Sequence, residues 1–347
     1  MIGYLRPWRR QDRDRHRRHG AVQRGDRPDE GVFAALDLGT NNCRLLVARP
    51  RDEGFRVIDA FSRIVRLGEG LGQNGHLSEP AMSRTIDALK VCAQKIQRRG
   101  VTHARQVATE ACRRAANCQD FLGRVERETG LVLEIISSRE EAELALTGCS
   151  PLLDPARPYA LMFDIGGGST EVLWLKVGQR RSLELIDLIS LPYGVVGLSE
   201  THGQDEALTE WYADASAEVA DLLAPFEARH AIAHHIAQGQ VQMLGSSGTV
   251  TTLAGVHLKL PRYDRAYVDG TYLAFDEIDR VSRTLASLNG AERAAAPCIG
   301  RERADLVVAG CAILDAICRT WPVGSLRVAD RGVREGILLG LMRDPGR

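Results

Sequence analysis

The sequence lacks several features that would assign it to a specialised class of protein. Its 347 residues contain no apolar run near the roughly 20 residues of a membrane helix, and the Arg-rich start of the chain lacks an apolar segment. We therefore expect neither a membrane association nor a secretory signal. Acidic and basic residues cancel at 45 each. Because proteins that coat long nucleic acids usually carry a basic excess, we predict no nucleic-acid partner.

The eight cysteines form no recognisable metal-binding or disulfide pattern. None are spaced as C-x-x-C, and most lie in apolar or helical segments. We interpret them as reduced thiols of a cytoplasmic protein, with a metal-binding or disulfide-bonded set as the alternative. Lysine is also scarce, with four residues against 41 arginines. Arginine, whose planar guanidinium suits bidentate contacts with phosphate, is therefore the dominant cation.

The chain divides into a polar tail and two similar α/β units. Residues 1–30 hold nine Arg, five acidic residues and little that is apolar. This composition predicts a disordered tail, with a phosphate-binding arm as the alternative. An apolar strand, a turn at Asp37 and two further strands follow, and the same unit recurs with its turn at Asp164, 127 positions later. We therefore predict two duplicated domains, 31–150 and 151–329, with a C-terminal helix at about 330–347 that packs back on the first.

The order of apolar runs and turn residues predicts alternating strands and helices. We expect strands at about 32–36, 44–48, 55–60, 106–109, 131–136, 159–163, 171–175, 182–191, 241–244 and 326–329. We expect helices at about 79–98, around 113, from 139, in parts of the chain after 205, and at 302–319 and 332–342. Residues 68–75 are Gly-rich and are predicted to form a loop.

Three glycine-containing turns, each directly after a strand, form the candidate phosphate-binding site of the chain. Backbone N–H groups in such turns bind phosphate oxygens, because no side chain stands in the way. The candidate phosphate-binding residues are Gly39, Thr40, Asn41, Gly166, Gly167, Gly168, Ser169, Thr170, Gly245, Ser246, Ser247, Gly248 and Thr249. Asp37 and Asp164 precede two of the turns, and Glu171 follows the second. These three carboxylates are the predicted ligands of Mg²⁺, held against the phosphate.

The combination resembles the actin/Hsp70/sugar-kinase superfamily and, within it, the Ppx/GppA phosphatase family of exopolyphosphatases and guanosine pentaphosphate phosphohydrolases. The segments that carry the resemblance are 35–41, 109–113, 135–142, 163–171, 245–249 and 334–336, in matching order from about residue 32 to 342. The resemblance implies two duplicated actin-like (ribonuclease H-like) α/β domains with a phosphate-binding cleft between them. It also admits a homodimer. Because the dipeptide His-Asp never occurs, we expect the short form without an HD-type domain.

The resemblance also implies roles for two residues. Glu141, the second of the pair Glu140-Glu141, aligns with the glutamate that activates the attacking water, and Arg113 aligns with an arginine that holds the terminal phosphate. The residues add a physical argument, because Glu141 opens a predicted helix whose dipole favours an ionised carboxylate. Without the resemblance, Glu141 would ordinarily be interpreted as a solvated acid and Arg113 as a surface arginine.

Two positions depart from the family pattern. Thr40 stands where Ser is common, which keeps the hydroxyl. Arg331 follows Asp330 where the family usually has Gly. Arg331 is predicted either to contact phosphate or to crowd the turn.

The implied function is hydrolysis of the terminal phosphoanhydride of inorganic polyphosphate, with Mg²⁺ as cofactor. Hydrolysis of guanosine pentaphosphate (pppGpp) is the near alternative, because the same turns and base serve both substrates. A non-catalytic sensor of alarmone or polyphosphate and an ATP-driven clamp are alternatives of another class. With a net charge of zero, a polyanion must be met by local arginines, for which Arg63, Arg66, Arg113 and Arg114 are candidates.

Overall fold

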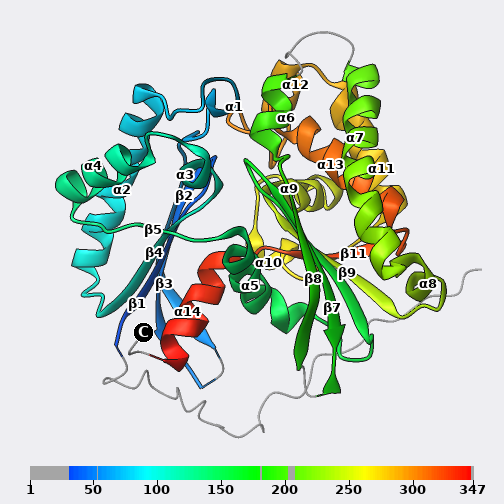
Figure 1. Cartoon of the computed structure of the whole chain (residues 1–347), viewed down its shortest axis with the longest axis horizontal. Helices are drawn as coiled ribbons and strands as arrows, with labels where there is room; N and C mark the ends of the chain where they lie inside the picture. The colour runs from blue at the N-terminus through cyan, green and yellow to red at the C-terminus, as the bar shows by residue number, and fades with distance from the viewer. Residues whose placement is uncertain (1–30, 53, 180–181, 202–207, 345–347) are drawn as a thin grey trace, which may run out of the picture.

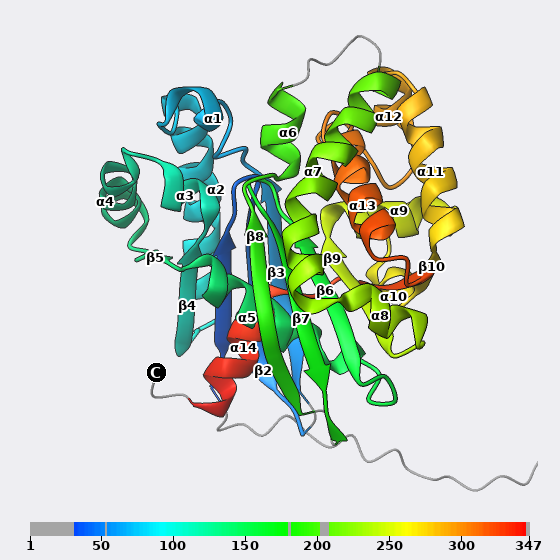
Figure 2. The ribbon, with the colours of Figure 1, turned by 45° about the vertical axis from the view of Figure 1, so that its right-hand side comes forward.

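The computed structural model describes residues 31–52, 54–179, 182–201 and 208–344. These residues form two mixed β-sheets, each flanked by helices, that lie side by side (Figures 1 and 2). The predicted α/β class with two domains is therefore confirmed. No helix in the described ranges is long and apolar enough to cross a membrane.

The first domain contains a five-stranded sheet. Its strands are β1 (Phe33–Leu38), β2 (Asn42–Pro50), β3 (Phe55–Ile64), β4 (His103–Ala108) and β5 (Glu134–Ile135), in the order β3-β2-β1-β4-β5. β1 to β3 are antiparallel neighbours, and β4 runs parallel to β1. Its helices are α1 (Leu71–Asn74), α2 (Glu79–Arg98), α3 (Glu110–Arg114), α4 (Cys118–Thr129) and α5 (Ser138–Cys149). Five of the six residues of β1 are buried, as expected for a central strand that is covered on both faces.

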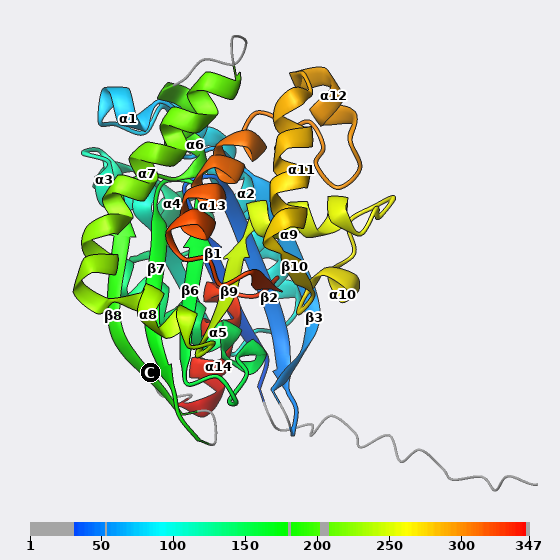
Figure 3. The ribbon, with the colours of Figure 1, turned by 90° about the vertical axis from the view of Figure 1, so that its right-hand side faces the viewer.

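The second domain contains a six-stranded sheet of related topology. Its strands are β6 (Tyr159–Ile165), β7 (Thr170–Val177), β8 (Leu183–Leu191), β9 (Val241–Ser247), β10 (Tyr272–Ala274) and β11 (Ser325–Ala329), in the order β10-β11-β9-β6-β7-β8. Its helices are α6 (Val195–Thr201), α7 (Leu208–His230), α8 (Ile232–Ala237), α9 (Gly248–His257), α10 (Arg265–Val268), α11 (Phe275–Ser287), α12 (Gly290–Ala295) and α13 (Val307–Thr320). Figure 3 shows α7, α13 and α11 covering the outer side of this sheet.

The duplication that the sequence predicts is visible in the strand pairing. β6 to β8 repeat the antiparallel run of β1 to β3, and β9 runs parallel to β6 as β4 does to β1. Asp37 and Asp164 occupy corresponding places, one residue before the end of β1 and of β6. The fold thus brings each aspartate to the end of a central strand.

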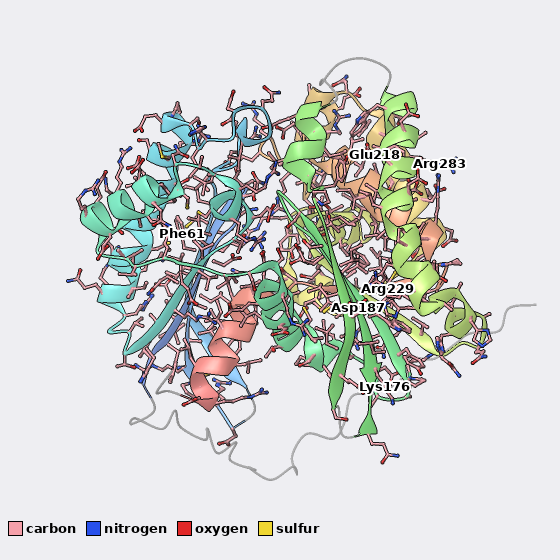
Figure 4. The ribbon with its side chains drawn as sticks, viewed as in Figure 1. Phe61, Lys176, Asp187, Glu218, Arg229 and Arg283 are labelled. Atoms are coloured by element: carbon pink, nitrogen blue, oxygen red, sulfur yellow. The ribbon has the colours of Figure 1, made fainter. Side chains whose placement is uncertain are left out.

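Polar side-chain contacts hold the end of α7 against the rest of the second domain. Asp187 of β8 forms an ion pair of 2.9 Å with Arg229 at the end of α7 and accepts a hydrogen bond from His230 (Figure 4). Trp321, fully buried, donates its indole N–H to Glu227 of the same helix. These contacts lie away from the two glycine turns that end β1 and β6.

The chain returns to the first domain at its end. α14 (Val333–Arg343) packs against α5 and β1, as Figure 1 shows. The hydrophobic core at this place joins both sheets, with Phe33 and Leu46 from the first, Met162 from the second and Leu338 from α14. Glycine permits the contact between the helices, because a Cβ atom added at Gly336 would lie 2.0 Å from the carbonyl oxygen of Leu144.

Some elements differ from the sequence prediction. The strand expected at 131–136 is reduced to Glu134–Ile135, and the Gly-rich loop at 68–75 contains the short helix α1. The helix expected at 302–319 spans Val307–Thr320, because the residues before Val307 form turns. All eight cysteines are free thiols, and seven of them are buried. The tail predicted at 1–30 lies outside the described residues.

The contact of α14 with α5 predicts that alanine substitution changes stability differently at Gly336 and Gly340 of α14. Gly336→Ala should destabilise the protein by about 2–4 kcal/mol, because the new Cβ overlaps backbone of α5. Gly340→Ala is the control, because a Cβ there meets nothing within 4 Å. That substitution should stabilise the helix by about 0.5–1 kcal/mol. Urea unfolding of both variants checks the prediction, and equal effects would contradict it.

Candidate active site

A cavity of about 500 Å³ lies where the two sheets face each other. It is lined by the turn after β1, the turn after β6, the turn between β9 and α9, and the start of α14. Glu141 of α5 also reaches it. The structure therefore brings the three glycine turns of the sequence prediction to one place.

Most of the predicted site residues line this cavity. They are Asp37, Gly39, Thr40, Asn41, Glu141, Asp164, Gly166, Gly167, Gly168, Ser169, Ser246, Ser247, Gly248 and Thr249.

Four predicted residues lie behind the cavity wall. Thr170 is fully buried and donates its hydroxyl to the carbonyl oxygen of Tyr193. Gly245 gives room to the Phe163 ring, which would lie 2.7 Å from a Cβ at that position. Glu171 and Arg113 also lie behind the lining residues. Thr170 and Gly245 therefore shape the turns without facing the cavity.

The glycine turns of the two domains touch each other. A Cβ at Gly167 would lie 3.1 Å from the backbone nitrogen of Asn41, and a Cβ at Gly168 would lie 2.7 Å from Thr40 Oγ1. Gly194 closes the turn from behind, because its Cβ would lie 2.4 Å from backbone atoms of Gly167 and Gly168. Glycine at these positions is what allows both turns to share one cavity.

Several polar atoms of the first turn are buried without a partner. Thr40 Oγ1, Asn41 Oδ1 and Asn42 Oδ1 make no hydrogen bond to any residue that the structure describes. A buried polar group without a partner costs about 1–3 kcal/mol. Three such oxygens in one turn therefore indicate a position for a bound cation or for hydrogen-bond donors of a ligand.

The two aspartates at the strand ends fit a divalent cation. Burial raises the pKa of Asp37, while the nearby Arg44 lowers it. Burial and the neighbouring Glu141 carboxylate raise the pKa of Asp164 from 3.8 to about 7. Carboxylates held close together in this way are stabilised as anions by a cation, and Mg²⁺ usually takes only one or two protein carboxylates besides phosphate and water.

The predicted metal set is only partly assembled. Glu171 does not line the cavity and accepts a hydrogen bond of 2.9 Å from Ser190. In the described ranges, no three acidic, His or Cys side chains are arranged as a ready-made metal site. The residues that fit Mg²⁺ are therefore Asp37 and Asp164, with the unpartnered oxygens of the first turn beside them.

Glu141 and Arg113 form an ion pair at the cavity. Arg113 Nη1 donates to Glu141 Oε2 at 2.9 Å and to the carbonyl oxygen of Ile136 at 2.8 Å. Glu141 lies in the first turn of α5, whose N-cap is Ser137. Glu140, in contrast, pairs with Arg105 and does not line the cavity. The preceding strand and the helix start thus direct only the second glutamate inward.

Burial acts on the charge of Glu141 against the effect expected from the helix start. The helix start was expected to favour the ionised carboxylate, but burial and the nearby Glu171 carboxylate raise the pKa of Glu141, against the lowering effect of Arg113. Burial favours the neutral carboxyl because it reduces the contact of the side chain with water. A raised pKa near the working pH is the property that a general base requires.

The arginines that line the cavity differ from the predicted ones. Arg44, Arg265, Arg303, Arg331 and Arg334 line it. Burial lowers the pKa of both Arg303 and Arg334, and the charge of Arg44 acts in the same direction. Cations crowded in this way favour an anionic ligand. Arg44 lies directly opposite Asp37 in the pairing of β1 with β2, which the sequence alone does not reveal.

The arginines proposed from sequence have other contacts. Arg66 forms an ion pair of 2.8 Å with Asp305, and Arg63 lies over the ring of Phe61, which Figure 4 labels on the first domain. Neither these two nor Arg114 lines the cavity. Arg331 lines it, but its guanidinium is held by Asp269 at 2.6 Å, and its backbone does not require glycine. The turn therefore accommodates Arg331 without crowding.

The raised pKa of Asp164 predicts how stability depends on pH. A carboxyl whose pKa is raised by folding binds a proton more tightly when folded, so stability falls as pH rises from the unfolded value of 3.8 to about 7. In the presence of a chelator, we expect Tm to fall by roughly 2–6 °C between pH 5 and pH 7.5. Asp164→Asn should flatten this slope, and Mg²⁺ should restore Tm at pH 7.5.

Asp87→Asn, at an exposed position of α2, is the matched control and should keep the slope. A Tm that rises with pH in the unsubstituted protein, or an equal slope in Asp164→Asn, would contradict the assignment. Scanning calorimetry in buffers of equal ionic strength makes the measurement.

The chain is similar to known proteins over most of its length. The model of the Ppx/GppA phosphatase family matches residues 46–344. The chain is 30 % identical to guanosine-5'-triphosphate,3'-diphosphate pyrophosphatase of Aeromonas salmonicida, over 90 % of this chain and 59 % of that protein. It therefore spans about 59 % of the length of the curated relatives it matches.

Solved structures share the fold. A Ppx/GppA family member from Aquifex aeolicus is 29 % identical, with a TM-score of 0.75 and coverage of 91 % of this chain and 99 % of that one. An exopolyphosphatase from Cytophaga hutchinsonii is 23 % identical, with a TM-score of 0.80 over 90 % and 98 % of the chains, and supports the fold alone. The actin-like, two-domain architecture is thus confirmed, and the chain belongs to the Ppx/GppA phosphatase family.

Proposed function

We propose that this protein hydrolyses the terminal phosphoanhydride bond of inorganic polyphosphate and releases orthophosphate. The observation that carries the proposal is the cavity itself. It joins the partly buried carboxylate of Glu141, the glycine turns of both domains and the crowded Arg44, Arg303 and Arg334 in one space. Such a space suits a linear phosphate chain whose end lies beside a base.

The mechanism follows from the groups present. The backbone N–H groups of the glycine turns and the hydroxyls of Thr40 and Thr249 hold the phosphate oxygens. Arg113, which lies behind the lining residues and is paired with Glu141, adds positive charge beside the base. The terminal phosphorus is thereby fixed close to the base. Positioning of this kind supplies a large part of catalysis in phosphoryl transfer.

The chemical step is an in-line displacement. Glu141 accepts a proton from a water molecule, whose oxygen forms a bond to the terminal phosphorus while the bridging P–O bond breaks. The bridging oxygen stays on the shortened chain, and the charge that develops on it faces the lining arginines. Mg²⁺, held by Asp37 and Asp164, would neutralise charge on the phosphates.

The lining of the cavity favours polyphosphate over a nucleotide. Among the lining residues, Tyr263 is the single aromatic side chain, and its hydroxyl already donates to Asp330 at 2.6 Å. The lining therefore provides many cations for phosphate and little surface on which a base would stack. pppGpp is the second candidate, because the Aeromonas relatives are named for hydrolysis of that nucleotide.

The alternatives of another class receive less support. A sensor that binds phosphate without turnover does not need a buried glutamate paired with an arginine at the phosphate turns, and the chain has this pair. An ATP-driven clamp needs no base at that position either. The Glu141–Arg113 pair is therefore the feature that separates a hydrolase from both.

A side-by-side assay tests the substrate class. We expect orthophosphate release from long polyphosphate at a higher kcat/KM than from pppGpp, and little release from ATP. Exhaustive chelation should abolish release, because the crowded phosphates and carboxylates need a divalent cation. Preference for pppGpp would support the second candidate. Release that survives chelation would contradict the proposed cation site.

Glu141→Gln tests the base. Turnover should fall by roughly 10²–10⁴, because the amide cannot accept the proton, while substrate binding is largely kept. Glu140→Gln is the control and should lose less than about threefold, because Glu140 faces Arg105 outside the cavity. Phosphate release and substrate affinity are measured on both variants. Turnover in Glu141→Gln like that of the unsubstituted protein rules out the role.

A further inference from the structure

Glu110 is a third glutamate near the reacting position. It is the first residue of α3, two residues after the end of β4, and it lines the cavity. Its side chain is 16 % exposed. Glu110 also contacts the second domain, because a Cβ at Gly168 would lie 2.9 Å from its Cγ atom. Its carboxylate therefore stands between Arg113 and the turn that binds phosphate in the proposed function.

Arg113 is held on three sides in the structure. Its Nε donates to Glu110 Oε2 at 3.0 Å, and its Nη1 donates to Glu141 and to the carbonyl oxygen of Ile136. Nη2 is buried and forms an ion pair of 2.8 Å with the same Glu110 oxygen. The contacts thus fix the plane of the guanidinium.

We propose that Glu110 is a positioning residue that fixes the Arg113 guanidinium between the base Glu141 and the terminal phosphate. The inference rests on the proposed function. Without the Glu110 anchor, Arg113 keeps its bonds through Nη1 but can rotate about them, so the plane of its guanidinium is no longer fixed. Misplacement of a phosphate-binding group by about 1 Å can cost on the order of 10²-fold in rate.

The charge of Glu110 has a second, separable effect. A carboxylate beside bound phosphate repels it, and this repulsion acts on the substrate and on the orthophosphate product alike. Glu110 therefore holds Arg113 in place and at the same time weakens the binding of free phosphate. A purely structural role predicts no such change in phosphate affinity.

Two substitutions separate the two effects. Glu110→Ala removes both the anchor and the charge, whereas Glu110→Gln keeps an oxygen that can accept the Arg113 Nε–H bond and removes only the charge. Glu140→Gln is the matched control, because Glu140 also pairs with an arginine, Arg105, but lies outside the cavity. All variants are made in the full chain, and thermal unfolding verifies that they are folded.

The readouts are the single-turnover rate on polyphosphate and inhibition by orthophosphate. Glu110→Ala should lower the single-turnover rate roughly 10- to 100-fold, and Glu110→Gln should recover most of that loss. Glu110→Gln should lower the inhibition constant for orthophosphate roughly three- to tenfold. The control should change neither quantity by more than about twofold.

The outcomes distinguish this inference from the proposed function. If the unsubstituted protein releases no orthophosphate from polyphosphate or pppGpp, the proposed function fails. If it does, a Glu110→Ala rate within twofold of the unsubstituted one overturns the positioning role. An equal loss in Glu110→Gln and Glu110→Ala overturns it as well. If Glu110→Ala does not fold, an unchanged orthophosphate inhibition constant in Glu110→Gln overturns the inference.

Discussion

The close approach of two glycine turns is the constraint on which the site depends. Gly167 and Gly168 of the second domain press against Thr40 and Asn41 of the first, at distances where any larger side chain would overlap. Because each turn follows an aspartate at the end of a central strand, the contact brings Asp37 and Asp164 into one cavity. The duplicated strand–turn unit thus produces a single site only when its two copies meet.

The two turns bring together charged groups whose charged forms are destabilised by burial, and a ligand can relieve this cost. Burial raises the pKa of Asp164 and Glu141 and lowers that of Arg303 and Arg334, so charges of both signs are less stable there than in water. A cation with a phosphate chain complements both groups, the carboxylates on one side and the arginines on the other. Binding of such a ligand would therefore offset the cost of burying these charges.

Local sequence patterns predicted the strands, helices and turns, because the formation of these elements depends on residues that are neighbours in the sequence. The apolar runs of β1 and β6 and the glycines after them are readable without tertiary structure. Arg44 and Arg303 were missed, because their place at the cavity depends on strand pairing and on packing between distant segments. The effect of burial on the pKa of Glu141 was missed for the same reason, since burial does not show in a local pattern.

The two domains contribute different parts of the site, which makes their contact a condition for chemistry. The first domain supplies Glu141 and Arg113, and the second supplies the glycine turn at 166–168 and Arg303. Two further contacts join the domains, an ion pair of 2.8 Å between Arg66 and Asp305 and a hydrogen bond of 2.9 Å from the Gly70 nitrogen to Glu200. If the domains separated, the base and its arginine would remain paired, but the phosphate would lose the turn that holds its other side. The proposed hydrolysis would therefore require both domains in contact, and the contacts remote from the cavity would support it by holding the domains together.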